Sequence, residues 1–178
     1  MHFILSQVFV LLGIISIVLS LWYRDKTKIL ICCLLSSIMF ALQYFFLGAV
    51  EGLIINSIGI IRAIWFFIYD KKSKPIPLYP LIILIVLFLL TMIFTYEGLI
   101  SFAPFIAASL LTYSIWDHRV LVYKIAAIPI SLCWILYNVH VGSIFGYISD
   151  SVLLIIEICA FIEYLIRNKK FKLLNKHK

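Results

Sequence analysis

Charged side chains are scarce in this chain. Asp, Glu, Lys and Arg together make up 13% of its 178 residues, whereas hydrophobic residues make up 65%. Soluble globular domains average roughly 25% charged and about 45–50% apolar residues. This composition excludes an ordinary soluble domain. It predicts an all-α polytopic membrane protein with a single membrane domain over residues 1–178.

Sequence signatures of catalysis and of metal binding are also missing. The chain contains no HExxH motif, no glycine-rich phosphate loop and no Ser/His/Asp set. Its four cysteines lie inside apolar runs and lack the spacing of metal ligands. We therefore expect no enzyme activity, no cofactor and no metal site.

Seven apolar runs are long enough to cross a bilayer as helices, which takes roughly 20 residues each. They cover residues 3–22, 29–47, 52–69, 77–95, 98–116, 120–140 and 147–166, and a basic tail follows at residues 167–178. The first run has no basic segment before it, so we expect a retained span and not a cleaved signal peptide.

The basic residues are distributed unevenly among the connections between these runs. Apart from Arg62, every Lys and Arg lies in or next to the first, third or fifth connection, or in the tail. The other three connections carry only Glu51 and Glu97 as charged residues. The positive-inside rule then predicts an outer N-terminus and a cytoplasmic C-terminus. This pattern accounts for the net charge of +7, so we expect no nucleic-acid partner.

Two segments resemble each other at an offset of 94 residues. Gly48 aligns with Gly142 and Gly52 with Gly146, in a chain with only seven glycines. The repeat makes residues 3–69 and 98–166 two three-helix units, joined by a linker helix at residues 77–95. Three spans per unit and one linking span give both units the same orientation. The paired glycines serve either tight turns or close helix packing.

Several of these residues also carry a resemblance to a known family. The chain resembles the YgjV-type family of small bacterial inner-membrane proteins over nearly its whole length. The points of likeness are Arg24-Asp25, "YFFLG", Asn56, Arg62, "CWILYN", Gly142-Ser143 and the polar residues Asp150 and Glu157. The resemblance implies the inner membrane and this architecture but no substrate. The 3+1+3 layout is also similar, in topology alone, to SWEET-type sugar facilitators and Pnu-type vitamin transporters.

Arg62 places a charge near the middle of the third span, and Glu157 lies at the matching depth of the seventh. Ionisable residues inside a membrane are candidates for function by default. We expect the two side chains to face the interior of the bundle and to interact directly or through one water. Such a pair either binds or gates a solute, or it only stabilises the fold.

Four further residues complete the candidate site. Asn56 and Asp150 are related by the offset of 94 and either receive a ligand from outside or cap a first helical turn. Trp134 and Asn138 share a helix face, which suits a flat polar ligand. Interfacial anchoring and helix–helix hydrogen bonding explain these two residues as well. The predicted substrate-binding set is Arg62, Trp134, Asn138, Glu157, Asn56 and Asp150.

The sequence therefore predicts a transporter or facilitator for a small polar solute, working by alternating access between two three-helix repeats. The alternative is a membrane protein that does not transport, such as a scaffold, a sensor or an immunity-type protein. A continuous polar cavity that links Arg62, Asn138 and Glu157 would favour the transporter. The expected partners are the lipid bilayer and a small polar solute, and homo-oligomerisation is left open.

Overall fold

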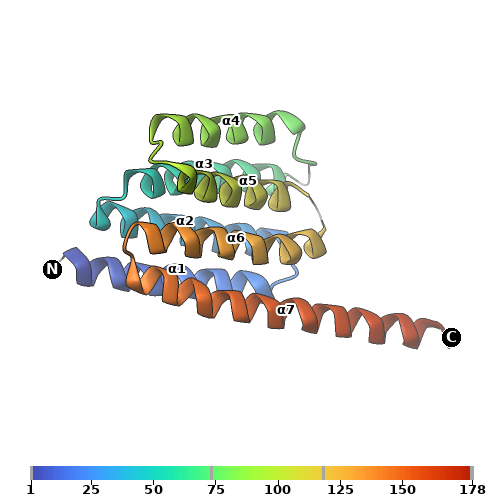
Figure 1. The fold of residues 1–178 in the computed structure, drawn as a ribbon. Helices are drawn as coiled ribbons and strands as arrows, with labels where there is room; N and C mark the ends of the chain where they lie inside the picture. Colours follow the sequence, from blue (N-terminus) through green and yellow to red (C-terminus); the bar gives the residue numbers. More distant parts are fainter. Residues whose placement is uncertain (1, 73, 118, 177–178) are drawn as a thin grey trace.

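The computed structural model describes residues 2–72, 74–117 and 119–176, and in these ranges all regular secondary structure is helical (Figure 1). The helices are α1 (His2–Trp22), α2 (Lys26–Leu47), α3 (Val50–Lys71), α4 (Leu78–Phe94), α5 (Phe102–Trp116), α6 (Val120–His140) and α7 (Ile144–Lys176). A 3-10 turn, η1 (Leu99–Ser101), precedes α5. The fold class is therefore all-α, as the sequence predicts.

Local sequence accounts for several helix boundaries. The Asp25 carboxylate accepts a hydrogen bond from the backbone N–H of Thr27 at 3.0 Å and caps the start of α2. Gly48 ends the same helix in the left-handed conformation, with φ 73°. Pro77 precedes α4, where its missing N–H costs no helical hydrogen bond. These residues fix where the chain turns at the two ends of the bundle.

Two predicted elements differ from those observed. The fifth apolar run begins as η1, so α5 itself starts only at Phe102. α7 continues to Lys176, well beyond residue 166, and takes in most of the predicted tail. Lys and Arg are good helix formers, so the helix need not end where the apolar run does. Residues 177 and 178 of the tail lie outside the described residues.

In the described part of the chain, six helices are long and apolar enough to cross a membrane: α1, α2, α3, η1 with α5, α6, and α7. α4 is a shorter apolar helix of 17 residues. At 1.5 Å per residue it is about 26 Å long, close to the lower limit for a span. Its surface is widely apolar, with Ile82, Val86, Ile93 and Phe94 all exposed.

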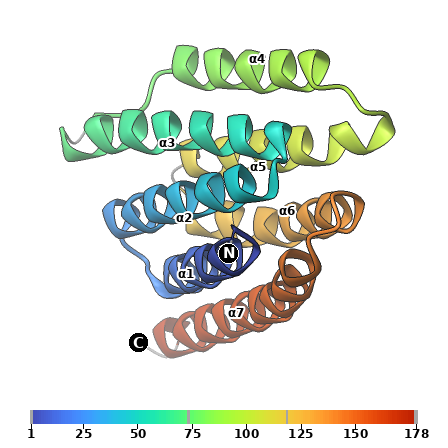
Figure 2. The ribbon, with the colours of Figure 1, turned by 90° about the vertical axis from the view of Figure 1, so that its left-hand side faces the viewer.

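The helices form two layers of three that face each other (Figure 2). α2 packs between α1 and α3 in one layer, and α6 packs between α5 and α7 in the other. Contacts between α3 and α5 close one edge of this sandwich, and contacts between α1 and α7 close the other. α4 lies outside, against α3 and α5. The space between the two layers is where a central site has to be sought.

The odd-numbered helices run in one direction and the even-numbered ones in the other (Figure 1). The connections after α1, α3 and α5 therefore lie at one end of the bundle, which is also the end of the C-terminus. The connections after α2, α4 and α6 lie at the other end, with the N-terminus. All of the Lys- and Arg-bearing connections consequently lie at a single end.

Candidate functional site

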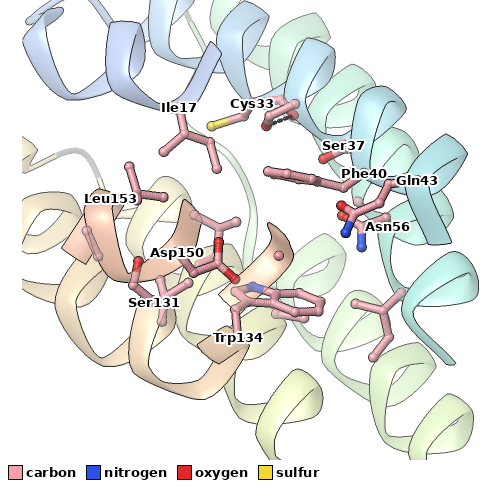
Figure 3. A pocket seen from close by; sticks show the side chains of 18 of the residues that line it. Ile17, Cys33, Ser37, Phe40, Gln43, Asn56, Ser131, Trp134, Asp150 and Leu153 are labelled. Carbon is pink, nitrogen blue, oxygen red and sulfur yellow. Dashed lines mark hydrogen bonds between the residues drawn. The ribbon is translucent and has the colours of Figure 1, made fainter. Parts of the chain in front are cut away.

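A cavity of about 80 Å³ lies between the two helical layers. Residues from α1, α2, α3, α5, α6 and α7 line it, whereas α4 contributes none of them. A volume of this size has room for several water molecules or for one small solute. Figure 3 shows Phe40 of α2 and Trp134 of α6 on opposite sides of the pocket.

The six residues of the predicted substrate-binding set all line this one cavity: Asn56, Arg62, Trp134, Asn138, Asp150 and Glu157. Two come from α3, two from α6 and two from α7. Arg62, Asn138 and Glu157 thus line one cavity, as the sequence analysis expects of a transporter. A role in binding substrate stays a prediction for each of the six.

A layer of hydrogen bonds lies beside the cavity at the end of the bundle where α2 and α6 finish. The Tyr44 hydroxyl donates to the Asn138 side-chain oxygen at 3.1 Å. The Asn138 amide in turn donates to the Asp150 carboxylate at 2.6 Å. Nearby, the Gly52 backbone N–H donates to the Tyr137 hydroxyl at 3.0 Å. The first and third of these bonds join one three-helix layer to the other.

The four paired glycines serve two different purposes in the structure. Gly48 and Gly142 have φ angles of 73° and 69°, a left-handed conformation that favours glycine and turns the chain sharply. Gly52 and Gly146 allow close approach, because a Cβ atom on either would overlap the side chain of Tyr44 or Asn138 at 2.7–2.8 Å. Both sequence-based interpretations therefore hold, each for a different pair.

The helix-cap interpretation of Asn56 and Asp150 is wrong. α3 begins at Val50 and α7 begins at Ile144, so both residues lie well past the first turn. The Asn56 amide donates to the Gly52 carbonyl of the preceding turn at 2.9 Å. Asp150 accepts its hydrogen bond from Asn138. Both side chains are buried and line the cavity.

The direct contact expected between Arg62 and Glu157 is not formed. No ion pair or hydrogen bond joins them in the part of the chain that the structure describes, although both line the cavity. Arg62 instead donates to the Thr112 hydroxyl of α5 at 3.3 Å, and Glu157 lies close to Ser131 of α6. Arg62 of α3 thus contacts α5, and Glu157 of α7 lies close to α6, so the two charged groups do not meet.

Trp134 is part of an aromatic cluster in the wall of the cavity. Its ring stacks on that of Tyr44, with centroids 5.9 Å apart, and meets the ring of Tyr137 edge-on at 5.8 Å. The interpretation of Trp134 as an interfacial anchor does not account for these contacts. With Phe40 on the opposite wall, the cluster gives the cavity apolar faces beside its charged groups.

Several lining or supporting residues were not singled out by their sequence. Thr112 accepts a hydrogen bond from Arg62, and Ser131 lies close to Glu157. Ser37 and Phe40 lie on the wall opposite α6. The offset of 94 contains a signal for three of them, since it relates Ser37 to Ser131 and Phe40 to Trp134. Thr112 carries no such signal.

Three ion pairs among the described residues lie outside the cavity: one is local to the connection after α5, between Asp117 and Arg119 at 2.8 Å, and two others involve helical residues. Glu163 and Arg167 form the i, i+4 pair that their spacing predicts, at 2.6 Å. His140 approaches Glu97 at 3.8 Å, with both side chains exposed. None of these pairs lines the cavity, so none enters the site.

Comparison with protein families gives a match over most of the chain. A family model described as a bacterial inner membrane protein, Imp-YgjV, matches residues 4–168, which covers α2 to α6 in full and most of α1 and α7. Neither a curated protein nor a solved structure matches the chain. The family description agrees with the apolar, multi-helical structure. The chain belongs to the YgjV-type family of bacterial inner membrane proteins.

Proposed function

We propose that this protein is a transporter or facilitator for a small polar solute in the bacterial inner membrane, and not an enzyme. The observation that supports the proposal is the cavity between the two layers, where the buried charges Arg62 and Glu157 lie near Asn138 and Trp134. Burying a charge without a partner is costly. A scaffold has no need to keep such groups around an open cavity, whereas a transport site does.

The proposed topology has seven spans, with the N-terminus outside and the C-terminus in the cytoplasm. α4 counts as a span because its apolar surface is widely exposed and the helix lies alongside α3 and α5. A crossing by α4 also leaves all of the basic connections at the C-terminal end of the bundle. The positive-inside rule makes that end cytoplasmic.

The proposed architecture is a 3+1+3 parallel repeat, similar in layout to SWEET-type transporters. Exchanging α1, α2 and α3 for α5, α6 and α7 turns the α3–α5 contact into the α7–α1 contact, and both contacts are present. Eight pairs of cavity-lining residues are separated by 94 positions: Ile17 and Leu111, Cys33 and Ala127, Ser36 and Ile130, Ser37 and Ser131, Phe40 and Trp134, Tyr44 and Asn138, Asn56 and Asp150, and Gly59 and Leu153. Equivalent positions of the two units therefore line the same cavity.

Transport would proceed by alternating access, with one three-helix unit rocking against the other. The bonds from Tyr44 to Asn138 and from Gly52 to Tyr137 cross between the units at the outer end. These bonds have to break when the cavity opens outward. In the proposed cycle, the structure represents a state in which the two units are joined at this end.

A proteoliposome assay tests the proposal. Purified protein is reconstituted, incubated with an extract of polar metabolites, and the trapped contents are measured by mass spectrometry. We expect at least one small polar solute to accumulate above protein-free liposomes, and Asn138→Leu to abolish that signal. Ile155→Val, a change on the exposed face of α7, is the matched control and should retain it. If no solute distinguishes the wild type from empty liposomes, the transporter proposal is wrong.

A further inference from the structure

The cavity contains two opposite charges that each retain an unused polar atom. Arg62 and Glu157 are both only 3% exposed. Among the described residues, Nε of Arg62 and Oε2 of Glu157 have no hydrogen-bond partner. Buried polar atoms are nearly always paired, so two unpaired ones in one cavity call for an explanation.

The two charges lie at the same depth on helices that run in the same direction. Arg62 is 12 residues beyond the start of α3, and Glu157 is 13 residues beyond the start of α7. At 1.5 Å per residue, these positions are about 18 and 20 Å along their helices. The Thr112 hydroxyl accepts a hydrogen bond from the guanidinium, and Ser131 lies close to the Glu157 carboxylate.

We propose that the cavity binds a small zwitterion, a solute that carries one oxyanion group and one protonated amine. The inference rests on the proposed function only in taking the cavity as the solute site. The guanidinium of Arg62 binds the oxyanion, since its planar donors match the geometry of a carboxylate. Glu157 accepts the hydrogen bonds of the ammonium group, and Asp150 of the same helix lines the cavity as well.

A solute with a single charge fits this pair of groups less well. An anion satisfies Arg62 but leaves Glu157 desolvated beside a second negative charge. A cation satisfies Glu157 but leaves Arg62 without a counter-charge. A buried charge without a partner is penalised strongly in both cases. A zwitterion provides a counter-charge for both groups at once, and the small cavity volume excludes large zwitterions.

The test compares probes that differ by one group at a time, using the purified full-length protein. The zwitterions are glycine, β-alanine and 4-aminobutyrate, which separate the two charges by increasing lengths. The acids without the amine are acetate, propionate and butyrate, and the amines without the carboxylate are methylamine, ethylamine and propylamine. Binding is measured by calorimetry at fixed ionic strength. We expect the best zwitterion to bind at least tenfold more tightly than its matched acid and its matched amine.

The variants Arg62→Gln and Glu157→Gln should each weaken binding of that zwitterion at least tenfold, whereas Ile155→Val should leave it unchanged. The wild-type series is decisive even if a variant fails to fold. The zwitterion inference is wrong if none of the three zwitterions binds, or if a matched acid or amine binds as tightly as the best of them.

The same probes separate this inference from the proposed function. Counterflow of the best-binding zwitterion is measured in proteoliposomes that contain the wild-type protein. Binding without counterflow leaves the zwitterion site in place but contradicts transport of that solute. Uptake of singly charged or neutral solutes with no zwitterion binding supports transport and overturns the zwitterion inference.

Discussion

The Tyr44 hydroxyl lies 3.1 Å from the side-chain oxygen of Asn138, and the two residues are 94 positions apart in the chain. This is the offset that aligns Gly48 with Gly142. In the proposed repeat, a residue of one unit therefore bonds to its own counterpart in the other. Such a contact lies where the pseudo-twofold axis passes, and it is well placed to report on the separation of the units.

Tyr44→Phe should loosen the outer closure of the cavity. The change removes the bond to Asn138 and keeps the ring, at a cost of about 0.5–1.5 kcal/mol for one net hydrogen bond. We expect faster labelling of Ser37→Cys by a membrane-impermeant maleimide added from outside, in a chain whose native cysteines are replaced by alanine. Tyr113→Phe, a half-exposed tyrosine of α5, is the control. Equal labelling rates in both backgrounds would contradict this account of the outer layer.

Gly52→Ala should destabilise the protein through a specific overlap. The new Cβ would lie 2.7 Å from the ring of Tyr44, and overpacking of this kind costs about 1–3 kcal/mol. We expect a lower midpoint of thermal unfolding, and we expect Tyr44→Ala to relieve most of the added loss. The control is Gly48→Ala, where nothing lies within 4 Å and the cost comes from φ alone. Tyr44→Ala should not relieve that loss, and identical behaviour of the two alanine variants would disprove the overlap.

Reporter fusions should reveal whether α4 crosses the membrane. With seven spans, alkaline phosphatase fused after Lys72 is cytoplasmic and inactive, whereas phosphatase fused after Glu97 is outside and active. A C-terminal fluorescent fusion should be bright for the same reason. If α4 does not cross, the two phosphatase fusions lie on one side and give the same activity. That result would remove the seven-span topology.

Arg62→Leu and Glu157→Leu should act independently on the solute-free protein. Arg62 donates to Thr112, Glu157 lies close to Ser131, and no ion pair or hydrogen bond joins Arg62 to Glu157 in the described part of the chain. Residues that do not interact show coupling of less than about 0.5 kcal/mol, whereas paired charges show about 0.5–3 kcal/mol. A double-mutant cycle on thermal stability measures the coupling. A coupling above about 0.5 kcal/mol would support the direct ion pair that the sequence predicts.

The apolar runs and the basic connections were sufficient to locate the helices, because membrane spans depend on long stretches of one composition. Choosing polar residues inside those runs also located Arg62 and Glu157 on the cavity, since such residues avoid lipid. Their hydrogen-bond partners were not predictable. Whether Arg62 meets Thr112 or Glu157 depends on the rotation of each helix about its own axis, which composition does not specify.

The end of α7 shows a second limit of the sequence. The helix continues past Arg167 to Lys176 because a helix does not need a hydrophobic environment to persist. An apolar run therefore indicates where a helix lies in lipid, and not where the helix ends. The same distinction explains why α5 is shorter than its apolar run, the first part of which forms η1.

The position of α4 makes the two edges of the sandwich mechanically unequal. α4 is joined to α3 and α5 by the chain and packs against both, so it restrains the edge formed by these two helices. The opposite edge, between α1 and α7, has no covering helix in the described part of the chain, although Ser20 of α1 hydrogen-bonds to Tyr123 of α6 there at 2.7 Å. We expect the two units to separate most at the edge formed by α1 and α7. In the proposed transport cycle, the largest movement would therefore be at the edge far from the linker helix.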